Sequence, residues 1–390
     1  MNTTTPFWRD KRIKPILLQL LFVIIIGIAM FYFINNALTG LKRMGLSLSY
    51  SFLNSTASFD ISGDKLIEYS ATDKYSRAIL VGFLNTLRVA ILGIIFATII
   101  GVILGIARLS NNWLARNTSK VFVEIFRNTP LLVQMIIWYS AVFLTLPLIG
   151  DNYNFANAIF LSNRGIAIPW FKPIDITWIW LSFIVLGIIG AVFTWKWKIK
   201  QQVETGKRKY PSIWVFGTLL LSIIFPFVVT QSGPFTLSIP EINPNGRSFV
   251  GGFVISPSFG AVLLALVMYT SAFIAEIVRS GIMGVNKGQV EAAQSLGLKS
   301  STMLRLVIFP QAYRIMIPPM TSQYLNLTKN SSLAVAVGYP ELVSVGNTIL
   351  NQSGRAIQMI TIMIICYLTF SLITSLLMNI FNKYTQLVER

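Results

Sequence analysis

Long apolar runs constrain the fold of this chain more than any other feature of its sequence. A helix that crosses the hydrocarbon core of a bilayer needs roughly 20 consecutive, mostly apolar residues. Backbone polar groups in that core must bond to one another, which a helix achieves within one segment. The sequence therefore predicts an all-α polytopic membrane protein with about eight transmembrane helices, at about residues 16–34, 79–107, 131–149, 176–193, 213–229, 259–278, 313–327 and 357–381.

The composition and charge agree with a membrane location. The chain is 54% hydrophobic and 12% charged, whereas soluble domains carry about 25% charged residues. In a soluble protein the net charge of +18 would suggest a nucleic-acid partner. Here the Lys and Arg residues lie mostly between the apolar runs. The lipid bilayer is therefore the expected partner, and nucleic acid is not.

The basic residues also indicate the orientation. With both termini in the cytoplasm, most of the 32 Lys and Arg residues fall on the cytoplasmic side, as the positive-inside rule predicts. Arg9, Lys11, Arg12 and Lys14 precede the first run. That run is too long for a signal peptide, and no small-x-small cleavage site follows it, so an uncleaved first helix is expected.

Two features of the chain limit its chemistry. It has no histidine, and its one cysteine, Cys366, lies inside an apolar run. A histidine metal site, a histidine general base and an internal disulfide are therefore excluded. No GxxxxGK[ST] phosphate loop occurs, so the chain is not expected to bind ATP through one.

The seventh run is short and contains Pro318 and Pro319. Proline lacks the backbone N–H of a helix, and such a gap is tolerated at membrane depth only where protein or water covers it. This run is therefore expected to face the protein interior rather than lipid.

A polar loop follows the sixth run and extends to Pro310. Residues 289–296 are good helix formers, and Gly297 follows where a helix end needs a positive φ. A second short helix is expected next, capped by Ser300, Ser301 or Thr302, with Met303, Leu304, Val307 and Ile308 as its apolar face. Paired alanines would let another protein approach closely, and Glu291 offers a carboxylate to a basic surface. An amphipathic loop lying on the lipid headgroups fits the same residues equally well.

The order Glu291-Ala292-Ala293, Gly297 and Pro310 resembles the EAA loop of permease subunits in bacterial ABC importers. Phe309 stands where Leu is usual before the proline. Residues 82–87, 122–134 and 275–282 are similar to the polar amino-acid permease family. The extra first helix and the long middle insertion resemble its general L-amino-acid permease branch. The resemblance covers about residues 79–381.

The resemblance implies a type I ABC importer permease core of five helices within residues 79–381. These are the helices at about 79–107, 131–149, 259–278, 313–327 and 357–381. Residues 150–258 would be an insertion carrying the helices at about 176–193 and 213–229. Residues 1–78 would hold a cytoplasmic tail, the first helix and a periplasmic loop. Residues 279–310 would be the cytoplasmic coupling loop, and 382–390 a cytoplasmic tail.

The same resemblance implies transport of L-amino acids across the bacterial inner membrane. An ABC ATPase dimer would receive the coupling residues Glu291, Ala292, Ala293, Gly297 and Pro310. A periplasmic amino-acid-binding protein would deliver the substrate. A second permease subunit is implied, and the branch favours a paralogue over a second copy. The chain would be no enzyme and bind no cofactor, because ATP and Mg would lie on the ATPase.

Arg88 is the main candidate for contact with the substrate. It lies about nine residues into the second run, or roughly 14 Å at the helical rise, which places it near the middle of the bilayer. A guanidinium suits the carboxylate of an amino acid. A later start of the span, with Arg88 extending outward to the headgroups, is the alternative. Asn85, Thr86 and Gln134 are candidates for a polar path, although hydrogen bonds between helices explain them equally well.

Two charged pairs lie near the cytoplasmic ends of the predicted helices. Glu276 and Arg279 are three residues apart, and Glu124 and Arg127 repeat the spacing, so each pair shares a helix face. Structural ion pairs or gate contacts are favoured over substrate contact. Gly101 and Gly105 have the spacing of close helix packing.

Two other function classes fit the sequence less well. A transporter driven by an ion gradient would be expected to show inverted repeats and buried acidic residues, neither of which is evident. A membrane-embedded enzyme would need catalytic side chains that this chain lacks.

Overall fold

The computed structural model describes residues 13–43, 49–61, 63 and 65–385 of the chain. Within them, six helices are long and apolar enough to cross a membrane, or up to eight if each of two bent helix pairs is one span. The prediction of a helical, polytopic membrane protein is confirmed. The predicted tails at residues 1–12 and 386–390 lie outside the described residues.

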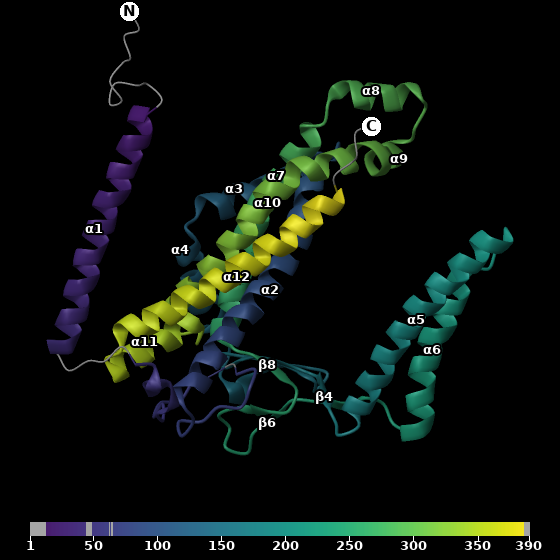
Figure 1. Ribbon diagram of the computed structural model, residues 1–390. Coiled ribbons are helices and arrows are strands. Elements are labelled where there is room, and N and C mark those ends of the chain that lie inside the picture. The colour runs from purple at the N-terminus through teal and green to yellow at the C-terminus, as the bar shows by residue number, and fades with distance from the viewer. Residues whose placement is uncertain (1–12, 44–48, 62, 64, 386–390) are drawn as a thin grey trace, which may run out of the picture.

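A bundle of long helices forms the centre of the molecule (Figure 1). It consists of α2 (Tyr75–Ala107), α7 (Pro257–Met283), α10 (Phe309–Asn330) and α12 (Ala356–Thr385), with the shorter α11 (Leu342–Ser353). Apolar residues of α2, α7 and α10 make up its main core. The sequence did not predict α11, which is short and carries several polar residues.

Small residues bring α2 and α7 close together. A Cβ atom added to Gly101 would lie 2.6 Å from Cβ of Ile274, and one added to Gly105 would lie 2.7 Å from Cβ of Val278. The residue numbers increase together on both helices, so α2 and α7 run in the same direction. The glycine spacing seen in the sequence therefore serves the contact between these two helices.

The third predicted span begins directly after a sharp bend that separates it from α3 (Trp113–Asn128), a helix that the sequence did not predict. Helix α3 meets α4 (Leu131–Ile136), which continues as the π-helix η3 (Ile137–Phe143), and the two parts are bent by 104°. Thr129 and Pro130 separate them, because proline cannot continue the hydrogen bonding of α3. The span predicted to reach residue 149 is helical only to Phe143, and Pro147 lies in the turns beyond it.

The seventh span also differs from the prediction. The expected second short helix is the start of α10: α9 (Ser300–Met303) and the π-helix η5 (Leu304–Ile308) lead directly into it. The residue before α9 is Lys299, and no serine or threonine side chain caps it. Helix α10 continues through Pro318 and Pro319, and the 3-10 helix η6 (Ser331–Val337) then leads to α11. Both prolines are exposed on this chain, so the expected burial of this segment holds only for its opposite face.

The middle insertion contains small sheets as well as two long helices. Helix α5 (Thr177–Thr205) and α6 (Pro211–Thr230) form a hairpin that stands apart from the bundle (Figure 1). Antiparallel β1 (Tyr153–Phe155), β2 (Ile159–Ser162), β3 (Gly165–Ile168) and β8 (Phe253–Ile255) form one sheet in that order. Two ribbons pair β4 (Trp170–Pro173) with β5 (Phe235–Ser238) and β6 (Glu241–Ile242) with β7 (Phe249–Val250). A short 3-10 helix, η4 (Ile149–Asp151), precedes them.

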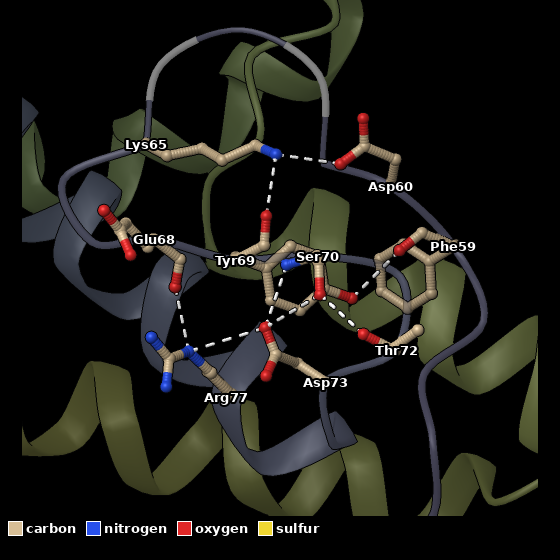
Figure 2. A network of polar contacts seen from close by, with 9 residues as sticks. All are labelled: Phe59, Asp60, Lys65, Glu68, Tyr69, Ser70, Thr72, Asp73 and Arg77. Carbon is tan, nitrogen blue, oxygen red and sulfur yellow. Dashed lines mark hydrogen bonds and ion pairs between the residues drawn. The ribbon is translucent and has the colours of Figure 1, made fainter.

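The segment before α2 folds over one end of the bundle. Phe52, in the 3-10 helix η2 (Ser51–Asn54), and Tyr69 belong to a buried cluster that also includes Val345 of α11. Figure 2 shows its polar contacts: Lys65 donates to Asp60 at 2.8 Å and to the carbonyl of Tyr69 at 3.1 Å. The Tyr69 hydroxyl donates to the carbonyl of Phe59 at 3.0 Å. By contrast, none of residues 14–40 in α1 (Ile13–Arg43) is buried, and most of them are apolar and exposed.

Candidate functional site

The loop between α7 and α10 projects from one end of the bundle (Figure 1). Its first helix is α8 (Lys287–Ser295), which ends at Gly297 with φ +72°. The Leu298 N–H donates to the Ala293 carbonyl at 3.2 Å, and the Gly297 N–H donates to the Gln294 carbonyl at 2.9 Å. These two bonds define a Schellman motif, which needs a left-handed residue at the position of Gly297. The positive φ expected from the sequence is present.

One face of α8 holds the helix on the protein, and the other is open to a partner. Ala293 is buried at 3% exposure, and Val290 packs on the main core. Glu291 and Ala292 are exposed, and Leu296 is 79% exposed at the end of the helix. The sequence analysis missed Leu296. The sequence does contain an indication of it: a large apolar residue stands directly before the turn glycine, where a surface turn without a partner would usually have a polar residue.

The loop returns to the bundle at Pro310, in the first turn of α10. The π-helix η5 precedes α10 directly, so the missing N–H of Pro310 falls at an irregular point of a continuous helical segment. Gln311 donates to Gln289 of α8 at 3.4 Å. The loop is therefore a rigid projection seated on the ends of α7 and α10.

A cluster of charges joins α2 to α7 just above this loop. Glu276 accepts from Arg279 at 2.5 Å and 3.1 Å on one oxygen, and from Arg108 on the other. The predicted Glu276–Arg279 pair is present, and Arg108 extends it to α2. The second predicted pair, between Glu124 and Arg127, does not form. Glu124 lies 3.8 Å from Lys120 instead, and the guanidinium of Arg127 lies over the ring of Phe273.

Arg88 in α2 and Arg108 directly after it are separated by about the thickness of the hydrocarbon core. Arg88 and Arg108 are about 20 residues apart, which is roughly 30 Å along a helix and matches the hydrocarbon thickness. Only Thr98 is polar between them. Thr98 therefore lies at mid-depth, and its hydroxyl is 2.9 Å from that of Tyr324 on α10. The depth of Arg88 in the bilayer stays a prediction, and α2 begins at Tyr75, four residues before the expected start of the span.

Arg88 stacks on aromatic rings. Its guanidinium lies 3.8 Å from the centre of the Phe259 ring and 5.1 Å from that of Phe253. Phe259 is in the first turn of α7, and Phe253 is in β8. These contacts join α2 to the inserted sheet.

The other pathway candidates form hydrogen bonds within the protein. Asn85 is fully buried and donates to the carbonyl of Pro340 at 2.9 Å. Thr86, also buried, accepts from the Leu342 N–H at 3.0 Å. Gln134 donates to the carbonyls of Phe126 and Thr129 at 2.9 Å, across the bend between α3 and α4. The geometry favours the second interpretation of these residues, as hydrogen bonds between segments.

The structure presents a different polar surface, on α10. Exposed residues recur there every three or four positions and so form one stripe along the helix: Ile315, Pro318, Pro319, Ser322, Asn326 and Lys329. Ser322 lies close to Tyr324, at mid-depth. A lipid-facing stripe would be apolar, so this surface fits a water-filled path or another subunit.

Comparison with known proteins identifies the family. Residues 97–386 match the family described as the binding-protein-dependent transport system inner membrane component. The chain belongs to this family.

Relatives match along almost the whole chain. The general L-amino acid transport system permease protein AapQ of Rhizobium johnstonii is 44% identical over 98% of this chain and 94% of its own length. The putative amino-acid ABC transporter permease protein YhdX of Escherichia coli is 42% identical over 98% and 96%. A crystal structure of an amino acid ABC transporter with histidines has a TM-score of 0.47 at 19% identity, over 80% of this chain and 95% of that one.

Membership of this family decides between the function classes. The chain is an ABC importer permease subunit of the inner membrane, and the ion-driven transporter and the membrane enzyme are excluded. It works with a separate ATPase, a binding protein and a further permease subunit. ATP is hydrolysed on the ATPase.

Proposed function

We propose that this chain forms half of the pathway of an importer for L-amino acids. Relatives that match nearly its full length carry names of amino-acid permeases. A third, BztB of Rhodobacter capsulatus, is 37% identical over 98% of this chain and 96% of its own length. It is named as a permease protein for glutamate, glutamine, aspartate and asparagine.

The projecting α8 supports the coupling role proposed for residues 291–310. Glu291, Ala292 and Leu296 present one carboxylate, one small residue and one large apolar residue to a partner. Buried Ala293 and the turn at Gly297 fix the helix on the bundle, so a push on α8 is transmitted to α7 and α10 through Pro310. The partner is an ABC ATPase dimer that holds ATP and Mg.

The arrangement of the ends supports cytoplasmic placement of both termini. In Figure 1 the start of α1, the end of α12, the turn between α5 and α6, and α8 all lie toward the same end of the molecule. The α5–α6 turn, residues 196–209, carries six basic residues and one acidic residue, as a cytoplasmic loop should. The sheets lie at the opposite end, where a periplasmic amino-acid-binding protein delivers the substrate.

The stripe of α10 supports a paired permease subunit. Pro318 and Pro319 supply no N–H groups, so carbonyl groups one turn earlier lack their helical donors. Exposure of these carbonyl groups to the hydrocarbon core would cost free energy. A second permease subunit, a paralogue of this chain, covers this stripe and encloses the path.

Replacement of Glu291 tests the coupling role. In the complete complex in proteoliposomes, Glu291→Lys is expected to raise the ATP hydrolysed per amino acid transported, or to release the ATPase. Thr205→Lys, at the exposed end of α5 and away from α8, is the control for an added positive charge. Ordinary coupling in the Glu291→Lys complex, with the ATPase still bound, contradicts the proposed contact.

A further inference from the structure

Lys329 is the most deeply placed unpaired charge on the exposed surface of α10. It lies five residues after Tyr324, which is about 8 Å at the helical rise. The hydrocarbon core extends about 15 Å from its middle. On the scale set by the spacing of Arg88 and Arg108, Lys329 therefore starts within the core. The sequence placed the end of this span at residue 327 and so missed it.

Lys329 forms no salt bridge within the described part of the chain. No described carboxylate lies within 4.0 Å of its ammonium group, and the side chain is exposed. An ionisable residue at this depth is costly unless it meets water, a counter-ion or another protein. Extension of the side chain to the headgroups would explain Lys329 alone. It would not explain why Asn326 and Ser322 continue the polar stripe to mid-depth.

An open surface hollow lies beside Lys329, and exposed side chains of α12 such as Ile364 and Leu368 form much of its wall. Its volume is about 510 Å³, and α11 and α12 supply most of its walls. Ligand pockets in proteins span roughly 300–1,000 Å³. Tyr367 and Ser371 are the other polar side chains in its lining, and the rest of the lining is apolar. One cation at the edge of an apolar hollow suits a small molecule that has one carboxylate and a variable side chain.

We infer that Lys329 binds the carboxylate of the amino acid as it passes along the stripe of α10. This inference rests on the proposed function, because it needs an amino acid as the substrate. It gives Lys329 the task that the sequence suggested for Arg88. Asn326 and Ser322 continue a wet, polar surface toward the cytoplasmic half of the path.

Charge replacement measures the contribution of Lys329. The complete complex, with its ATPase, second permease and binding protein, is reconstituted in liposomes with a radiolabelled mixture of L-amino acids. Lys329→Gln is expected to lower uptake roughly 10- to 100-fold, as for loss of a hydrogen bond to a charged group. Lys329→Arg is expected to keep most of the uptake. Lys383→Gln, an exposed lysine near the end of α12, is the control and should not change it.

Chemical rescue separates charge from structure. The chain has one cysteine, so Cys366→Ser with Lys329→Cys leaves a single thiol at this position. Modification with an aminoethyl methanethiosulfonate rebuilds a lysine-like side chain and should restore uptake. The sulfonatoethyl reagent, which adds a negative charge, should not. A trimethylammonium reagent should also modify Asn326→Cys but not Leu186→Cys, on the exposed apolar surface of α5.

The outcomes distinguish this inference from the proposed function. If the unmodified complex transports no amino acid with ATP, the proposed function fails. If it transports and Lys329→Gln transports equally well, only the assignment of Lys329 fails. Rescue of Lys329→Cys by both reagents also overturns it, because the charge then has no effect.

Discussion

Alanine at Gly101 or Gly105 should separate α2 from α7. A Cβ at residue 105 would lie 2.7 Å from Cβ of Val278 and 2.8 Å from the carbonyl oxygen of Ala275. Ordinary contacts between carbon atoms are about 3.5–4.0 Å, so the helices must move apart by about 1 Å. The carbonyl belongs to the backbone of α7 and cannot rotate away. Overpacking of this kind costs about 1–3 kcal/mol.

The double substitution should cost less than the sum of the single ones. Both glycines face α7 and lie one helical turn apart, so one separation of the helices relieves both clashes. The same movement draws Arg108 away from Glu276, which joins α2 to α7 just above the coupling loop. The complex should therefore be less stable, and transport should be less well coupled to ATP hydrolysis.

The assay is the unfolding midpoint of the purified complex together with the ATP hydrolysed per amino acid transported. Gly190→Ala in α5 is the matched control, because a Cβ there meets nothing within 4 Å and alanine favours the helix. The single variants should lower the midpoint and the control should not. Unchanged midpoints, or fully additive costs in the double variant, would refute the argument from the shared helix contact.

Three further predictions concern other parts of the chain. Gly297→Ala should destabilise the turn after α8 by about 1–2 kcal/mol, because φ at this position is +72°, and Gly297→Asn should destabilise it by less. Faster hydrogen exchange of the α8 amides measures the loss of stability. Equal exchange rates in the two variants would contradict the prediction. Thr86→Val should cost about 1–3 kcal/mol in unfolding free energy, since the buried Leu342 N–H loses its acceptor, whereas Thr86→Ser keeps it. Burial raises the pKa of Tyr69 to about 12 from 10.0, so its contribution to stability is complete below pH 10 and is lost as the pH rises through 12. Proteolysis of residues 49–74 should therefore accelerate over that range, and less so in Tyr69→Phe.

The sequence predicted the features that depend on local pattern. Apolar runs located most of the helices, and the position of Gly297 after a helix-forming stretch predicted its positive φ. The spacing of Glu276 and Arg279 predicted their pair, because residues three apart on a helix must be neighbours. Lys120 and Glu124 satisfy a similar rule, four residues apart, and the sequence could not decide which partner Glu124 takes.

Features that depend on contacts between distant segments were not predictable in the same way. Asn85 and Thr86 are bonded to residues about 255 positions away. A polar residue in an apolar run fits a substrate path and a buried hydrogen bond equally well, and only the position of Pro340 and Leu342 decides between them. The ion pair between Arg108 and Glu276 was not predictable for the same reason, because Glu276 lies on another helix.

The depth of a charge can be estimated once the correct reference is chosen. Counting from the start of an apolar run places Arg88 near the middle of the bilayer, and this stays a prediction. Counting between Arg88 and Arg108 instead yields the hydrocarbon thickness and puts Thr98 at its middle. The hydrogen bond between the hydroxyls of Thr98 and Tyr324 places Tyr324 of α10 at the same level. On this scale Arg88 holds the edge of the bundle, and Lys329 is the cation that a substrate meets inside the membrane.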